Sequence, residues 1–433
     1  MAESAPRPVR GYRTLMRVAV PIAGRLLRSP AARAGHLGRL EATAALAMWA
    51  GHRRDPMRRL VWFHAASVGE SLQAIAVLTA LVVRRPDLQT LVTHFSASAE
   101  RIADRFGADH VGYIPYDREA DVARVLESVR PDLLAFTKVD VWPELATAAV
   151  RHGVGTALVA GTVDPESSRL RWPSRRITRP GYRALEQIGA ISEPDAAGLV
   201  QLGADPARIV VTGDPRVDSA LARVAQRIPG RGDPLLLVAG STWRQDEAHL
   251  LAAFRTVRAR HPGARLWLVP HDPSTEAVAS IAARAASLDL PPVHVGRSLE
   301  PISTITEMGV LADLYAEAGL GYVGGGFGER GIHSVLEPAA VGIPILIGPH
   351  DRGVRDARLL AEAGGLVRIP RSDPERGLTA QWLEWLDHPG EAHRRGEAAR
   401  EALATDRGAA DRSADLLVDL LDRTRPSEPG RYP

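Results

Sequence analysis

The chain has 433 residues, of which 45% are hydrophobic and 24% are charged, a composition typical of an ordered globular protein. Its length exceeds what a single compact core supports and predicts two domains. The absence of cysteine excludes disulfides, thiolate catalysis and cysteine-bound metals, and the 14 histidines show no spacing typical of metal ligands.

The N-terminal region carries most of the positive charge. The first 60 residues contain twelve arginines and three acidic residues, a net charge of about +9, which leaves about −6 for the rest. Between residues 12 and 28, apolar residues interleave with arginines, and no uncharged apolar run is long enough to span a membrane. We expect residues 1–58 to be a basic amphipathic helical segment on an anionic membrane surface. A packed helix pair with solvated arginines is the alternative.

Two other roles for this basic region are not expected. Few aromatic residues lie among its arginines, so the sequence does not indicate a nucleic-acid partner. Arginine also interrupts the apolar run repeatedly, which is not typical of a cleaved signal peptide.

From residue 60 onward, short apolar runs alternate with helical patterns. This spacing is typical of βαβ units and predicts a parallel, doubly wound sheet. The predicted strands of this first half are 60–65, 89–93, 112–114, 133–137, 155–159, 188–191 and 209–212.

A cluster of Pro, Gly and charged residues at 226–234 predicts a linker, and the pattern then restarts. The sequence thus predicts an α/β protein with two Rossmann-like domains, 59–225 and 226–375, that face a central cleft. Residues 376–433 are predicted to form helices that pack back toward the first domain, with a frayed tail. Strands of the second half are expected at 235–239, 266–269, 293–295, 320–323 and 345–347.

The segment after the predicted strand 320–323 suits a phosphate-binding loop. Five glycines between residues 324 and 331 precede a helix expected near His333. Backbone N–H groups can approach a phosphate there, and the helix N-terminus adds positive potential. Glu337, about one turn into this helix, could accept hydrogen bonds from ribose hydroxyls. A tight turn with a capping acid is the alternative, because a lone glycine-rich loop is weak evidence.

Glu70 is the candidate general base of the first half. It follows the strand 60–65, and loops after the carboxyl ends of strands line the ligand crevice in such sheets. An acid that merely stabilises the first turn of a helix is the alternative. The loop 137–144 follows another strand and holds three charged residues beside Trp142, which makes it a second candidate edge of the cleft.

Eight blocks, in order and at the expected separations, resemble the Kdo transferase family, which links 3-deoxy-D-manno-octulosonic acid (Kdo) to lipid A precursor. They are HAASVGE (64–70), YIPYD (113–117), DVWPE (140–144), VTGDPRVD (211–218), AGST (239–242), LVPHDP (268–273), EMGVLADLY (307–315) and GGGFGERGIHSVLEPAAVGIPILIGPH (324–350).

The resemblance implies the two-domain GT-B architecture and the reaction of a lipid IVA 3-deoxy-D-manno-octulosonic acid transferase. CMP-Kdo would be the donor, a tetraacyl-disaccharide lipid A precursor the acceptor, and no metal or other cofactor would take part. The protein would be peripheral or monotopic at the cytoplasmic face of the inner membrane. Glu70 matches the family's catalytic carboxylate, which would deprotonate the attacking acceptor hydroxyl while CMP leaves from the opposite face with inversion.

The resemblance also suggests which residues hold each substrate. Met308 and Gly309 match the loop that frames cytosine, and Glu337 matches the ribose clamp. Acceptor-side candidates are Ser67, Gly69, Lys138, Asp140 and Trp142. Donor-binding candidates are Arg216, Ser241, Thr242, His271, Met308, Gly309, Gly325, Gly326, Arg330, Gly331, His333, Ser334 and Glu337.

Three departures from the family pattern leave other functions open. Lys138 replaces an acidic residue, His271-Asp272 replaces an Arg-His pair, and Ile332–Val335 replaces Gly-His-Asn-Pro. A GT-B enzyme that uses another CMP- or UDP-sugar on a lipid is one alternative. A degenerate GT-B scaffold is the other.

Overall fold

The computed structural model describes residues 7–164, 166–225, 232–329, 331–351 and 353–424. The chain divides into a first unit, residues 1–218 with 406–433, and a second unit, residues 219–405. The division falls within helix α8 (Pro215–Val224), a few residues before the boundary that the sequence predicts. Most of the predicted linker, 226–231, lies outside the described residues.

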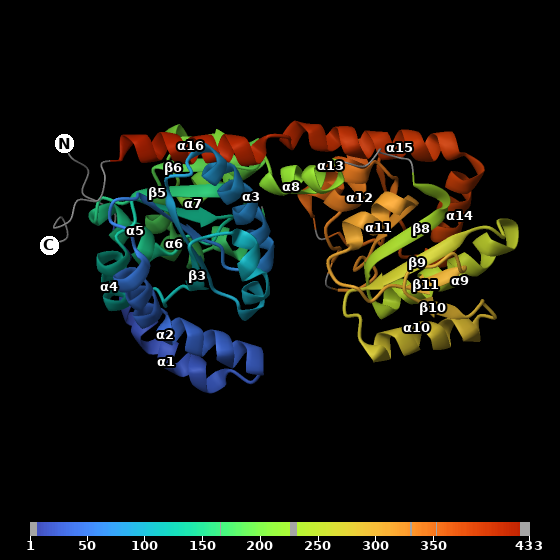
Figure 1. Ribbon diagram of the computed structural model, residues 1–433, viewed down its shortest axis with the longest axis horizontal. Coiled ribbons are helices and arrows are strands. Elements are labelled where there is room, and N and C mark those ends of the chain that lie inside the picture. Colours follow the sequence, from blue (N-terminus) through green and yellow to red (C-terminus); the bar gives the residue numbers. More distant parts are fainter. Residues whose placement is uncertain (1–6, 165, 226–231, 330, 352, 425–433) are drawn as a thin grey trace. The chain divides into compact units, whose positions relative to one another are not determined.

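Within the described residues, the first unit contains a seven-stranded sheet in the order β3-β2-β1-β4-β5-β6-β7. Figure 1 shows strands of this sheet with their flanking helices. Every pairing is parallel, as predicted. Each predicted strand of this half is present with ends shifted by at most two residues. The strands are β1 (Leu60–His64), β2 (Gln89–His94), β3 (His110–Tyr113), β4 (Leu133–Thr137), β5 (Gly155–Gly161), β6 (Gln187–Ala190) and β7 (Ile209–Val211).

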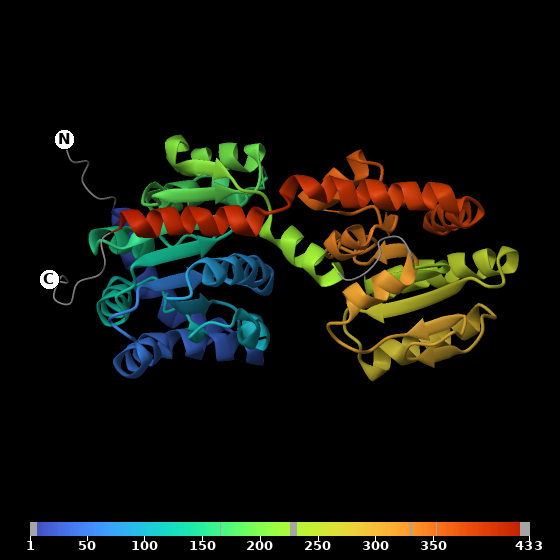
Figure 2. The same cartoon turned by 45° about the horizontal axis from the view of Figure 1, so that its top comes forward.

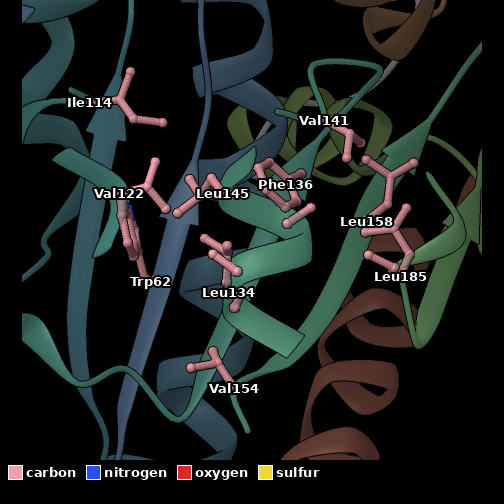
Figure 3. Close-up of a cluster of buried hydrophobic side chains, with 14 of the residues drawn as sticks. Trp62, Ile114, Val122, Leu134, Phe136, Val141, Leu145, Val154, Leu158 and Leu185 are labelled. Atoms are coloured by element: carbon pink, nitrogen blue, oxygen red, sulfur yellow. The ribbon is translucent and has the colours of Figure 1, made fainter. Parts of the chain in front are cut away.

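The central strands are apolar on both faces because helices cover both. On β1, Trp62 belongs to one hydrophobic cluster and Phe63 to another, as the two-residue period of a strand requires. Figure 3 shows the first cluster, where Trp62, Leu134 and Phe136 meet residues of the flanking helices. One face is covered by α2 (Pro30–Arg53), α4 (Glu119–Val129), α5 (Pro143–Arg151), α6 (Ser174–Arg183) and α7 (Glu193–Leu202); the other by α3 (Val68–Arg84), η1 (Ala97–Phe106) and α16 (Ala409–Arg423).

The second unit has a similar architecture. Its described residues form a parallel seven-stranded sheet in the order β10-β11-β9-β8-β12-β13-β14. Two of its strands, β11 and β14, were not predicted, because three apolar or mixed residues give too little periodicity to detect. The strands are β8 (Asp233–Thr242), β9 (Arg265–Pro270), β10 (Val293–Val295), β11 (Ile302–Thr304), β12 (Ala318–Val323), β13 (Ile345–Ile347) and β14 (Leu366–Arg368).

The C-terminal helices do not all pack as expected. Phe254 of α9 stacks on Trp382 of α14, with ring centroids 5.5 Å apart, so α14 and the following α15 belong to the second unit. Only α16 packs on the first unit, against α3 (Figure 2). The helices of the second unit are α9 (Arg244–Arg260), α10 (Thr275–Ser287), α11 (Leu311–Glu317), α12 (Leu336–Val341), α13 (Arg355–Glu362), α14 (Pro374–Asp387) and α15 (Pro389–Ala402).

The basic N-terminal region forms α1 (Arg10–Leu26) and α2, which belong to the first unit. Two polar contacts fix α1 to the first unit: the Tyr12 hydroxyl donates to the buried Asp117 over 2.6 Å, and Arg13 donates to Glu144 over 2.7 Å. Apolar side chains nevertheless remain exposed along α1, with Leu26 71% exposed and Leu15, Val18 and Ile22 about half exposed. Among the described residues, no helix is long and apolar enough to cross a bilayer.

Candidate functional site

Glu70 lies in the first turn of α3, directly after β1 at the carboxyl edge of the first sheet. Its side chain is 8% exposed, and Oε2 accepts a hydrogen bond from the Ala66 backbone over 2.7 Å. Burial, and then the charge of Asp140, raise the pKa of this carboxyl group above its ordinary value. Glu70 is therefore a buried carboxyl group with a raised proton affinity, as a general base requires.

The loop after β4 supplies the other charged groups at this edge. Lys138 is exposed and has a φ of 66°, a left-handed conformation that non-glycine residues seldom adopt. Asp140 accepts a hydrogen bond from Arg169 over 2.7 Å. Ser67 precedes α3 without capping it through its side chain, and Gly69 is exposed. The predicted acceptor-side residues thus gather on two loops, after β1 and β4, whose strands are paired.

Trp142 has a partner that the sequence did not reveal. Its indole N–H donates to Nε2 of His64 over 3.0 Å, and His64 is fully buried at the end of β1. Burial lowers the pKa of His64 to about 4, so the imidazole is neutral and can accept this hydrogen bond at neutral pH. The aromatic ring of Phe95 packs against Trp142, with centroids 5.4 Å apart.

Arg216 is the one predicted donor-binding residue that the structure places in the first unit. Its guanidinium donates to the buried Asp214, with Nε 2.9 Å from Oδ2. Burial raises the pKa of Asp214, but the charge and hydrogen bonds of Arg216 outweigh it and hold the pKa below its ordinary value. Arg216 is thus part of an ion pair whose carboxylate stays charged.

In the second unit, the glycine-rich loop after β12 passes close to other backbone. Gly325 has a φ of 99°, and a Cβ there would lie 2.2 Å from the Gly331 carbonyl oxygen. A Cβ on Gly326 would lie 2.7 Å from the Gly348 backbone. Only glycine fits at these two positions. The expected helix does not begin near His333, however; α12 begins at Leu336, which puts Glu337 in its first turn.

A buried carboxylate holds this loop in place. Asp246, fully buried in the first turn of α9, accepts hydrogen bonds from Gly325 N over 2.9 Å and from the Tyr322 hydroxyl over 2.7 Å. The Trp243 backbone N–H also donates to it over 2.9 Å. Sequence pattern did not indicate this network, because it joins residues almost eighty positions apart.

Two predicted donor-binding histidines stack on a tryptophan. The ring centroids of His271 and His333 lie 4.4 Å apart, and those of Trp243 and His271 lie 4.7 Å apart. The Trp243 indole N–H donates to Nε2 of His333 over 3.1 Å. The stack joins the ends of β8 and β9 to the loop after β12.

A cavity of about 860 Å³ opens beside this stack, and its size suits a nucleotide. Predicted residues in its wall are Thr242 and Gly325. The Thr242 hydroxyl donates to the buried Glu247 over 3.0 Å. Gly328 of the predicted glycine-rich loop also lines it, and wall residues that the sequence did not single out include Trp243, Gln245 and Glu247.

The other donor-binding candidates within the described residues do not line that cavity. Ser241 has a φ of 54° at the end of β8, and Gly309 has a φ of 83° beside Met308, which is 75% exposed. Glu337 forms an ion pair with Arg223 of the same unit, at 3.3 Å. The Ser334 hydroxyl accepts from Leu336 N over 3.3 Å. Gly331 has a φ of 80°, and Arg330 lies outside the described residues.

Solved structures of nucleotide-sugar enzymes share this fold. The chain is similar to the UDP-GlcNAc 2-epimerase of Neisseria meningitidis bound to UDP-GlcNAc, with a TM-score of 0.59 and 14% identity over 84% of this chain and 100% of that one. It is also similar to MurG of Acinetobacter baumannii, with a TM-score of 0.54 and 16% identity over 84% and 99% of the two chains. The two parallel α/β units therefore define a GT-B protein.

Residues 35–219 match the family model of 3-deoxy-D-manno-octulosonic-acid transferase (kdotransferase). The resemblance of the chain to the Kdo transferase family, expected from the motifs, is thereby confirmed. The relatives include 3-deoxy-D-manno-octulosonic acid transferases from Bordetella pertussis, 29% identical over 95% of this chain and 99% of that protein, and from Haemophilus influenzae, 24% identical over 86% and 90%. The homologues identify a glycosyltransferase.

Proposed function

We propose that the protein is an inverting glycosyltransferase that moves Kdo from CMP-Kdo to a hydroxyl group of the tetraacyl-disaccharide lipid A precursor. The match to the Kdo transferase family model and the similarity to its relatives support the reaction class. The observation that carries the proposal is Glu70, a carboxyl group with a raised pKa at the carboxyl edge of the first sheet.

Glu70 would act as the general base. Its carboxylate takes the proton of the acceptor hydroxyl as that oxygen attacks the anomeric carbon of Kdo, and the bond from this carbon to the CMP phosphate oxygen breaks. Burial makes the carboxylate a stronger base. Lys138, exposed on the neighbouring loop, would attract an anionic acceptor and stabilise the ionised base.

The second unit would hold the nucleotide without a metal ion. The leaving phosphate needs positive potential, which backbone N–H groups of the glycine-rich loop would supply. Glu337, which is ion-paired with Arg223, would accept hydrogen bonds from the ribose. Met308 and Gly309 would border the cytosine.

The exposed apolar residues of α1 give the protein a surface for its lipid substrate. Leu15, Val18, Ile22 and Leu26 are exposed and lie beside arginines, of which Arg17 is 71% exposed. Such a helix can lie in the interface of an anionic membrane. We propose that α1 keeps the protein peripheral at the cytoplasmic face of the inner membrane, where the acceptor is embedded.

The departures from the family pattern favour one second candidate, transfer of a different sugar from CMP. Asp272, which stands where the family has a histidine after an arginine, lines the cavity of the second unit. A carboxylate in that wall would disfavour an anionic sugar and favour a neutral one.

The test is transfer by the purified protein in detergent, with CMP-Kdo generated in situ and tetraacyl-disaccharide acceptor. Mass spectrometry of the lipid should show a gain of one or more Kdo units, with and without a metal chelator. No gain, in a preparation that CMP still stabilises against heat, would contradict Kdo transfer and favour another CMP-sugar.

A further inference from the structure

Residues 168–183 of the first unit form a strongly basic surface segment. It contains six arginines and no acidic residue, and it consists of η2 (Ser168–Leu170), a short connection and α6. All of these arginines except Arg169 are exposed. Trp172, in the connection, is 78% exposed, so an aromatic ring projects among the positive charges.

The charges of this segment are not neutralised by neighbouring carboxylates. Among the described residues, only Arg169 of the segment forms an ion pair, with Asp140. Arg175 and Arg176 lie in the first turn of α6, which contains no acidic residue. The helix dipole is positive at that end, so cations there are unfavourable. Binding of an external anion would reduce both the repulsion among these arginines and their unfavourable interaction with the helix dipole.

The segment borders the acceptor-side residues. It follows β5, whose carboxyl end lies beside that of β4. Arg169 bonds Asp140 at 2.7 Å, and the Tyr182 hydroxyl at the other end of the segment donates to the Val139 carbonyl over 2.7 Å. Two contacts therefore fix the segment to the loop that carries Lys138 and Trp142.

We propose that residues 168–183 contact the headgroups of an anionic phospholipid membrane. Trp172 would enter the headgroup layer, which tryptophan prefers, while the guanidinium groups of Arg171, Arg175 and Arg176 bind lipid phosphates, whose geometry they match. The segment occupies other positions in the chain than α1 and α2, and its exposed arginines would add electrostatic attraction to an anionic membrane. The contact would hold the acceptor-side loops against the surface where a lipid substrate lies, whichever sugar is transferred.

Vesicle binding of the full-length protein tests the charges. The variant R171Q/R175Q/R176Q should bind vesicles containing phosphatidylglycerol about tenfold or more weakly than the wild type, because each arginine contributes separately. The matched control is R255Q/R371Q/R376Q, which removes the same charge from exposed side chains of the second unit. It should bind as the wild type does.

A fluorescent label tests the position of Trp172. Because the chain has no cysteine, Trp172→Cys can be labelled alone with an environment-sensitive dye. Its emission should shift to the blue with phosphatidylglycerol vesicles and stay constant with phosphatidylcholine vesicles. The control is Thr79→Cys, an exposed position in the second half of α3, where no shift is expected.

Two results would overturn the proposal. One is unchanged vesicle binding by R171Q/R175Q/R176Q; if that variant also lost turnover in detergent micelles, the arginines would bind the acceptor's own phosphates instead. The other is an unshifted label at position 172 in samples that sediment with the vesicles. Neither result depends on whether Kdo is the sugar transferred.

Discussion

The candidate residues of the two units are held in different ways. In the first unit, the candidate site consists of charged and aromatic side chains: Glu70, Lys138 and the Trp142–His64 pair lie at the carboxyl edge of the sheet. In the second unit, the candidate site consists mainly of backbone. Its glycines pack closely against other backbone, and Asp246 holds Gly325 through a hydrogen bond. Side chains that exchange protons suit chemistry, and backbone N–H groups of a glycine-rich turn suit a phosphate. This contrast supports the proposal that the first unit acts on the acceptor and the second binds the donor.

The largest expected effect is a loss of turnover without a loss of CMP affinity. Glu70→Gln keeps the shape of the side chain and removes its basicity, so turnover should fall by between about 10² and 10⁴-fold. CMP affinity, measured by calorimetry, should stay within about twofold of the wild type, because the nucleotide would bind to the other unit. Equal losses in both would assign Glu70 a purely structural role.

The second prediction concerns the glycine-rich loop. Gly325→Ala places a Cβ 2.2 Å from the Gly331 carbonyl oxygen at a φ of 99°, and should cost about 3 kcal/mol of stability and most of the CMP affinity. Gly296→Ala is the matched control, with the same φ of 99° and nothing within 4 Å of its Cβ. It should cost only about 1–2 kcal/mol, with CMP affinity kept. Equal costs in urea unfolding would show that the close approach is unimportant.

His64 should make stability depend on pH. Its pKa falls from the ordinary 6.5 to about 4 in the folded protein, so the unfolded chain binds more protons between these values and stability is lost as pH falls. The loss is about 3 kcal/mol. Asp117, whose pKa burial raises to about 6, has the opposite effect between its ordinary 3.8 and 6.

Because His64 and Asp117 affect stability in opposite directions, the effect of His64 is measured by comparing a His64 variant with the wild type. Relative to the wild type, His64→Asn should gain about 3 kcal/mol of unfolding free energy as pH is lowered from 6.5 to 4, whatever Asp117 contributes. A constant difference between the two proteins over that range would mean that His64 titrates normally.

The smallest effect concerns the partner of His64. Trp142→Phe keeps an aromatic ring against Phe95 but leaves Nε2 of the buried His64 without its donor, and should cost about 1–2 kcal/mol. Trp172→Phe, at a side chain that is 78% exposed, should change stability by less than about 0.5 kcal/mol. Thermal unfolding of both variants measures the two shifts in Tm. Equal shifts would mean that the Trp142 hydrogen bond does not contribute to stability.

The sequence predicted what depends on local pattern. Strands such as Leu133–Thr137 and Val293–Val295 were predicted to the residue, because apolar runs bounded by turns mark buried parallel strands. The glycine-rich loop that permits close backbone approach was also predicted from the sequence. Gly408, with a φ of 78°, directly precedes α16 and helps to separate it from α15. This break was not predicted because a single glycine within a helical pattern is ambiguous.

Contacts between distant residues could not be predicted. The Tyr12–Asp117 hydrogen bond spans 105 positions, and the bonds of Trp142 to His64 and Asp246 to Gly325 span about eighty. These contacts decide which charges are buried, and hence the low pKa of His64 and the raised pKa of Glu70. A single sequence carries no periodic signal for such pairs.

Hydrogen–deuterium exchange tests the division of roles most directly. Addition of CMP to the full-length protein should slow exchange in peptides covering Gly324–Phe327 and Leu336–Val341 and leave those covering Ala66–Ser71 and Lys138–Trp142 unchanged. Lipid A precursor in micelles should protect the second pair of peptides alone. Protection by CMP of the loops around Glu70, with none in the glycine-rich loop, would contradict the assignment of the donor to the second unit.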